Sequence, residues 1–135
     1  MARAKKLDVE WSGQVRCFPG AKSLELEGSI QERIRLAVAA EGVLLFRNNT
    51  GVASYGKRKV RYGLAKGSAD LIGVVGPHGR FLAIECKRAK GGVEAEHQKR
   101  WLAWVRLYGG VSGFAKSVEE ALALVREART RPEET

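Results

Sequence analysis

The chain has 135 residues, 44% of them hydrophobic, which suits one folded domain with its own core. Its formal net charge of +9 favours a polyanionic partner, nucleic acid ahead of an anionic membrane surface. No apolar run approaches about 18 residues and the basic start lacks a hydrophobic signal core, so we expect no membrane contact and a cytoplasmic location. Cys17 and Cys86 lack Cys-x-x-Cys or Cys/His spacing, which argues against a disulfide framework and a structural zinc site.

The first half of the chain predicts an arm, a helix and a strand. Residues 1–22 carry turn and charge signals without periodicity, and we interpret them as an N-terminal arm. Residues 43–46 are typical of a strand, and residues 57–62 of an edge strand or an extended loop. A helix is expected from Ser23 to near Gly42, because apolar side chains recur there at the spacing of one buried stripe: Ile30, Ile34, Ala37 and Val38.

The second half predicts a hairpin over residues 67–87, followed by a helix, a strand and a helix. The helix after the hairpin covers residues 94–108 and stops at two glycines, and residues 111–116 form the strand. A capping box at residues 117–120 begins the last helix, and residues 131–135 are a tail. The inner stripe of the helix at residues 94–108 is expected to hold Gln98, Trp101, Leu102, Val105 and Tyr108 or Gly109, and Trp104 is also spaced as a core residue.

The hairpin carries the residues with most chemical meaning. With its tip at Pro77 and His78, a regular antiparallel pairing places Asp70 opposite Glu85. Side chains alternate along a strand, so Lys87 points to the same side as Glu85, and Cys86 to the other side as a small buried hydrophobe. Two facing carboxylates repel each other unless a cation lies between them. A divalent metal is therefore expected here, although a solvated strand end paired with Arg61 or Arg88 is the structural alternative.

Two further polar residues fall on helix faces that point inward. Glu27 lies on the buried stripe of the first helix, where it is either a third acid at the metal or a carboxylate serving the helix dipole. Gln98 precedes Trp101 and Leu102 on an inner face, where it either reaches the site or stays half exposed. Carboxylates and a backbone carbonyl suit Mg²⁺, which can assist phosphodiester hydrolysis, and Lys87 would add a positive charge beside the reacting phosphate.

Basic and polar residues bracket this acidic centre in the sequence. Their distribution is that expected of a groove that holds a phosphate backbone over a metal, although a generally solvated basic surface is the alternative. The predicted nucleic-acid-binding residues are Arg47, Asn48, Asn49, Lys57, Arg58, Lys59, Arg61, Lys66, Ser68, Arg88 and Lys90.

Several segments together resemble the VRR-NUC (virus-type replication-repair nuclease) domain of the PD-(D/E)xK nuclease superfamily. The resemblance covers about residues 23–126, within a nuclease domain that we place at residues 23–130. The segments that carry it are EGSIQ from Glu27, GVLLFRNNTG from Gly42, Gly63-Leu64, GSADLIG from Gly67, IECK from Ile84, and Gln98. One departure is Ala69, which stands where the superfamily usually has proline; proline there supplies no chemistry.

The resemblance implies a restriction-endonuclease-like α/β core, with a mixed central β-sheet flanked by helices. The elements predicted above from the sequence patterns follow the order α-β-(β)-β-β-α-β-α. The resemblance maps the acid of the family's first helix onto Glu27, which would contact the metal through a water molecule. It maps the metal-binding acids onto Asp70 and Glu85, with the Cys86 backbone carbonyl as a further ligand. The family lysine corresponds to Lys87 and the later glutamine to Gln98. These five side chains (Glu27, Asp70, Glu85, Lys87 and Gln98) are the predicted catalytic residues, with Mg²⁺ or Mn²⁺ as cofactor.

The predicted function is structure-specific hydrolysis of DNA by a metal-dependent endodeoxyribonuclease. The resemblance to standalone phage and bacterial members implies Holliday junction resolvase-like action by a homodimer on branched DNA. A flap endonuclease or DNA nickase with the same site is one alternative. A non-catalytic basic DNA-binding module is another, which would need no metal.

Overall fold

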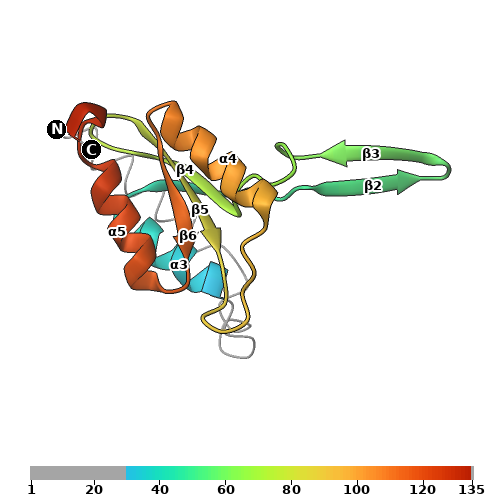
Figure 1. Cartoon of the computed structure of the whole chain (residues 1–135), viewed down its shortest axis with the longest axis horizontal. Helices are drawn as coiled ribbons and strands as arrows, with labels where there is room; N and C mark the ends of the chain where they lie inside the picture. The colour runs from blue at the N-terminus through green and yellow to red at the C-terminus, as the bar shows by residue number, and fades with distance from the viewer. Residues whose placement is uncertain (1–29, 135) are drawn as a thin grey trace.

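A computed structural model describes residues 30–134, which form a mixed α/β fold with a four-stranded sheet between helices (Figure 1). The result agrees with the expected mixed sheet flanked by helices and is compatible with a restriction-endonuclease-like core. The arm, the start of the first helix and Glu27 lie outside the described residues. The elements in chain order are α3 (Ile30–Ala40), β1 (Leu44–Arg47), β2 (Gly51–Tyr55), β3 (Arg58–Tyr62), β4 (Leu71–Val75), β5 (Arg80–Cys86), α4 (Glu96–Leu107), β6 (Val111–Ala115), α5 (Val118–Ala128) and η1 (Pro132–Glu134).

The sheet has the strand order β1-β4-β5-β6, antiparallel except for the parallel pair of β5 and β6. The predicted hairpin register is confirmed, because Val74 pairs with Phe81 and Leu71 with Ile84. Asp70 and Glu85 occupy the next pair of positions beyond this ladder. The turn and the alternation of the strands therefore suffice to orient the acidic pair.

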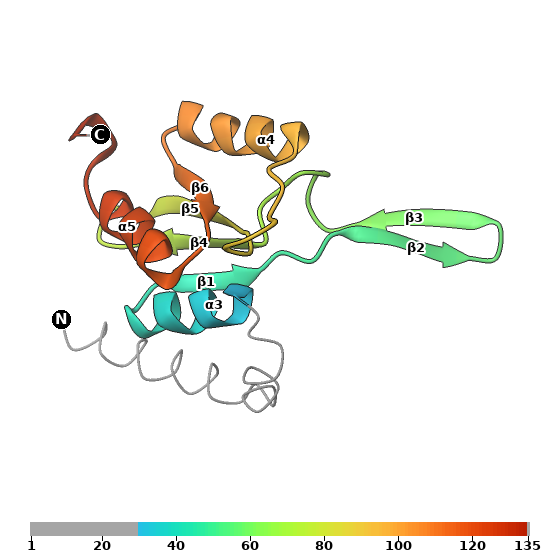
Figure 2. The same cartoon turned by 60° about the horizontal axis from the view of Figure 1, so that its bottom comes forward.

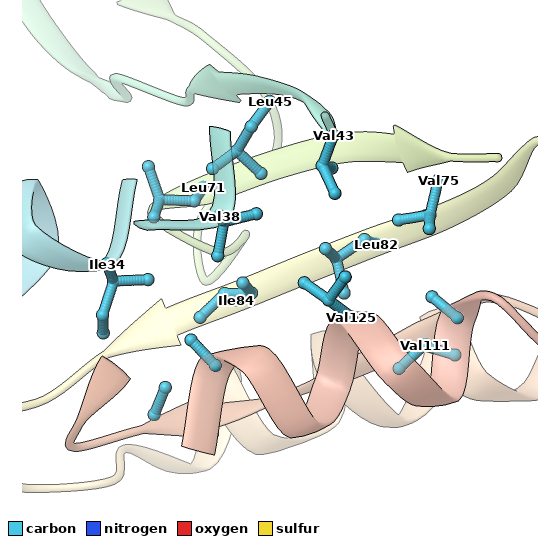
Figure 3. Close-up of a cluster of buried hydrophobic side chains, with 13 residues drawn as sticks. Ile34, Val38, Val43, Leu45, Leu71, Val75, Leu82, Ile84, Val111 and Val125 are labelled. Atoms are coloured by element: carbon cyan, nitrogen blue, oxygen red, sulfur yellow. The ribbon is translucent and has the colours of Figure 1, made fainter. Parts of the chain in front are cut away.

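One face of the sheet forms the main core with α3 and α5 (Figure 3). Leu71, Leu82 and Ile84 project from β4 and β5, while Ile34 and Val125 meet them from the two helices. The predicted stripe of the first helix is confirmed at its centre, where Ile34 and Val38 are fully buried. Ser117 accepts a hydrogen bond from the Glu120 N–H (3.1 Å) and caps α5 as predicted.

The opposite face of the sheet is covered by α4 over β5 and β6, as Figure 2 shows. Leu102 is buried there, with Trp101 and Val105 packed beside it. The prediction that Trp104 and Tyr108 are core residues is wrong: they are 61% and 85% exposed. Helical spacing identifies the residues that share a face, but α4 presents these two side chains away from the sheet.

The strands β2 and β3 form a separate two-stranded sheet that projects from the body as a ribbon (Figures 1 and 2). Of the two structures predicted for residues 57–62, an edge strand and an extended loop, the first is confirmed, and the strand belongs to this separate two-stranded sheet. It pairs with β2, a strand that the sequence analysis did not predict, through ladder partners such as Val52 and Arg61. No helix in the described part of the chain is long and apolar enough to cross a membrane.

Candidate functional site

Asp70 and Glu85 meet at the open end of the β4–β5 hairpin, on the face of the sheet that α4 covers. The Cys86 N–H donates to Asp70 Oδ2 (3.0 Å), and the Asp70 N–H donates to Glu85 Oε2 (3.1 Å). Each carboxylate is thus held by a backbone donor at or beside the position of the other. These reciprocal hydrogen bonds hold the two acids facing each other, as the sequence predicts.

Lys87 and Gln98 converge on the second oxygen of Glu85. Gln98 Nε2 donates to Glu85 Oε1 (2.6 Å), and Lys87 Nζ lies 3.7 Å from the same atom. Gln98 is itself oriented by the Ala95 N–H, which donates to its Oε1 (3.2 Å) at the start of α4. Glu85 is only 4% exposed, so the alternative of a solvated strand end paired with an arginine is wrong.

Burial shifts the protonation of both acids, and the Asp70 charge adds to the shift of Glu85. Burial, and after it the nearby Asp70 charge, raise the pKa of Glu85 to about 7, against the opposing effect of the Lys87 charge. Burial also raises the pKa of Asp70, against the hydrogen bond from Cys86 and the charges of Lys87 and Arg47. Ionisation of both carboxyl groups at neutral pH is therefore unfavourable unless a further cation lies beside them.

The donor set fits a hard divalent cation. Within the described residues, Asp70 Oδ1 accepts no protein hydrogen bond, and it is an available carboxylate oxygen beside Glu85. No group of three or more His, Cys, Asp or Glu side chains able to hold a metal is found among residues 30–134. Mg²⁺ is commonly bound through one or two carboxylates, waters and substrate phosphates, so two acids are compatible with it. The predicted third acid, Glu27, lies outside the described residues.

Cys86 agrees with its predicted structural role. Its side chain packs against the main core, on the face away from Glu85 and Lys87. Burial raises the pKa of its thiol, and the charges of Asp70 and Glu85 raise it further. A thiol held in its neutral form is a poor nucleophile. What remains for Cys86 at this site is its backbone carbonyl, the ligand that the resemblance assigns to it.

Asn48 and Ser68, two of the predicted nucleic-acid contacts, hold the chain together beside Asp70. Asn48 Nδ2 donates to Ser68 Oγ (2.7 Å) and to the Ala69 carbonyl (2.9 Å), so both of its amide hydrogens are engaged. The Asn48 N–H donates to the Asp70 carbonyl (2.8 Å). These contacts position the segment that leads into β4.

The remaining predicted nucleic-acid contacts are exposed but do not gather at one place. Arg47, at the end of β1, is close enough to Asp70 to affect its pKa. Lys66 lines a small cavity of about 180 Å³ with His97 and Arg100 on α4. The others lie in the ribbon and in the loops at its base and after β5: Asn49, Lys57, Arg58, Lys59, Arg61, Arg88 and Lys90.

Two parts of the molecule escaped sequence reasoning. Strand β2 carries few β-branched residues, but the two residues Gly56 and Lys57 between Tyr55 and Arg58 are a hairpin-turn signal, and Gly56 has φ +64°. No sequence pattern indicates that Arg80 is buried, since an arginine that follows a turn is usually exposed. In the fold it is 7% exposed.

Comparison of the chain with models of known protein families and with curated proteins gives no match.

Proposed function

We propose that this protein is a metal-dependent endodeoxyribonuclease that cleaves branched DNA. The observation that carries the proposal is the pair of facing carboxylates, Asp70 and Glu85, whose immediate neighbours are a lysine and a glutamine. A solvated or purely structural pair of acids does not need a lysine and a glutamine directed at one of its carboxylates. Hydrolysis of a phosphodiester does need such groups, because negative charge must be held and neutralised. The net charge of +9 supports a polyanionic substrate.

Each residue has a distinct role in this proposal. Asp70, Glu85 and the Cys86 carbonyl would hold Mg²⁺ or Mn²⁺, with Glu27 as a further acid. When bound, such an ion polarises the phosphate and lowers the pKa of the attacking water. Lys87 Nζ, 3.7 Å from Glu85, would place its positive charge beside the phosphate in the transition state. Gln98 would keep the Glu85 carboxylate oriented through its 2.6 Å hydrogen bond.

The proposal is tested with labelled four-way junctions, flaps, nicked duplexes and linear duplexes, incubated with Mg²⁺, Mn²⁺ or EDTA. We expect cleavage of branched DNA only with metal, and an Asp70→Asn rate about a thousandfold lower, because a metal ion contributes several kcal/mol to such reactions. DNA binding in EDTA should survive the substitution. Paired symmetric cuts would identify a resolvase. Wild-type protein that leaves every substrate intact, or an Asp70→Asn variant that cuts equally well, would refute the proposal.

We further propose that the enzyme acts as a homodimer, because symmetric cleavage of two strands needs two sites. The sheet face beside the site offers a surface for a second copy, since α4 lies mainly over β5 and β6, and Leu44 of β1 and Val74 of β4 stay exposed there. Exposed apolar side chains occupy this region and the adjoining outer face of α4: Leu44, Val74, Phe81, Trp104, Leu107 and Tyr108. A groove of about 290 Å³ lies between Phe81 and Tyr108. Such contiguous apolar surface on a basic protein marks an association site.

Sedimentation velocity tests the dimer. We expect the wild-type protein to sediment at twice the monomer mass, and Trp104→Ser/Leu107→Ser to sediment as a folded monomer. Val93→Ser serves as the control, because Val93 is an equally exposed apolar residue outside the surface. A wild-type monomer at all concentrations, or a double variant that remains dimeric, contradicts this assignment.

A further inference from the structure

The β2–β3 ribbon contributes little to the core of the protein. Within residues 30–134, its two strands pack extensively only on each other, and Figures 1 and 2 show them projecting from the body. A two-stranded hairpin by itself is marginally stable in water. An element of this kind, with five paired positions and no core behind it, is better explained by contacts with a partner than by stability.

The two faces of the ribbon differ in chemistry because side chains alternate along each strand. In the ladder, Arg61 pairs with Val52 and Lys59 with Ser54, so these four side chains share one face. They line a concave groove of about 520 Å³. The opposite face carries Tyr62, Val60 and Tyr55 beside a single cation, Arg58: Gly51↔Tyr62, Ala53↔Val60 and Tyr55↔Arg58 are its pairs.

Charge complementarity indicates the occupant of the concave face. Residues 51–62 contain four cationic side chains and no acidic one. Lys59 and Arg61, two residues apart on one strand, lie about 7 Å from each other along it. Two cations in a row over a concave surface suit a run of phosphates, and an antiparallel ribbon has the width that the major groove of DNA accepts.

The base of the ribbon is fastened next to the candidate active site. Asn48, before β2, is hydrogen-bonded to Ser68, after β3, and to the Asp70 carbonyl. The two stems also approach closely, since a Cβ at Gly63 (φ +84°) would lie 2.4 Å from the Asn49 carbonyl oxygen. The ribbon therefore starts beside the β4–β5 hairpin, which carries Asp70 and Glu85, and leads away from it.

We propose that the ribbon is a DNA-gripping arm, whose Lys59 and Arg61 face binds the duplex that flanks the cleaved phosphodiester. This inference rests on the proposed nuclease function. Five residues of a strand span about 17 Å, which corresponds to about five base pairs. The arm thus extends the bound DNA beyond the carboxylates, so that a substrate is held in two places, at the site and along the ribbon.

The test compares the two faces of the ribbon. Lys59→Ala/Arg61→Ala removes two cations from the concave face, and Lys57→Ala/Arg58→Ala removes two from the turn and the other face. Binding of each variant to duplex DNA is measured by fluorescence anisotropy over a range of salt concentrations, in EDTA so that no metal-dependent cleavage occurs. Removal of two phosphate contacts should weaken binding roughly 30-fold at 0.15 M salt and reduce the salt slope by about 1.8. The control double variant should change both quantities much less.

Footprinting provides a second readout. Hydroxyl-radical protection by wild-type protein should extend about five base pairs farther on one side than protection by Lys59→Ala/Arg61→Ala. Equal weakening by the two double variants, unchanged binding, or altered dimerisation without altered binding would overturn the assignment of the ribbon. Absence of cleavage by the wild-type protein would instead refute the nuclease proposal, so the two failures are distinguishable.

Discussion

Glu85→Gln is expected to stabilise the metal-free protein at pH 8 and to abolish its stabilisation by Mg²⁺. The Glu85 carboxyl is buried beside Asp70, and its pKa rises from an ordinary 4.5 to about 7. At a pH between 4.5 and about 7, Glu85 is protonated in the folded protein but has released its proton in the unfolded chain. The stability that Glu85 contributes is therefore fully present below pH 4.5 and is lost as the pH rises through 7.

The expected size of the effect follows from the same shift. A rise from 4.5 to about 7 corresponds to roughly 3 kcal/mol of unfolding free energy at pH 8. Glutamine cannot ionise, but its amide nitrogen must face either the Asp70 N–H or the Gln98 amide, both of which are donors to Glu85. We therefore expect a gain of roughly 1–3 kcal/mol at pH 8, which shrinks towards pH 5.

Chemical denaturation in EDTA between pH 5 and pH 8 measures this difference. Glu96→Gln is the matched control, because Glu96 is an exposed acid at the start of α4 whose ion pair with Lys99 lies in solvent. It should follow wild type at every pH. Added Mg²⁺ should raise the melting temperature of wild type and of Glu96→Gln only. A Glu85→Gln variant that is less stable than wild type at pH 8, or a difference that does not vary with pH, would contradict the electrostatic interpretation of the site.

Arg80→Met is expected to lower the free energy of unfolding by about 3 kcal/mol, since it removes charged hydrogen bonds from a buried position. Arg80 Nε donates to the Gly109 carbonyl (2.8 Å), just beyond α4. Its Nη1 donates to the Glu127 (3.3 Å) and Thr130 (3.4 Å) carbonyls at the end of α5. One buried cation thus satisfies carbonyls at the C-terminal ends of two helices, where positive charge is favourable.

Urea denaturation at neutral pH checks this prediction. Arg126→Met is the control, an exposed arginine of α5, and it should unfold close to wild type. Arg80→Lys should recover only part of the loss, because an ammonium group cannot span carbonyls that the planar guanidinium reaches together. The cleavage rate well below the melting temperature should stay near wild type, since Arg80 begins β5 and Glu85 lies near its other end. Equal stability of Arg80→Met and Arg126→Met would show that the hydrogen bonds of Arg80 contribute nothing to the free energy of unfolding.

The proposed dimer surface and the ribbon show where sequence reasoning reached its limit. The spacing of Trp104 and Tyr108 suggested core residues, but a helical period cannot tell which faces of a helix have a neighbour. Strand β3 was predicted without its partner, because β2 has a weak apolar pattern and pairs locally instead of with the main sheet. Both differences concern what an element packs against, which depends on the whole fold.

The sequence by itself determined the local geometry of the candidate site. The turn at Pro77 and His78 and the two-residue alternation of the strands are short-range properties, so Asp70, Glu85 and Lys87 could be oriented before the fold was known. Only the tertiary structure decided that Gln98 touches Glu85 and that burial raises the pKa of this carboxyl. The same holds for the buried position of Arg80 and the projection of the ribbon from the body. Burial and contacts between distant segments depend on how helices and strands pack, which no local pattern specifies.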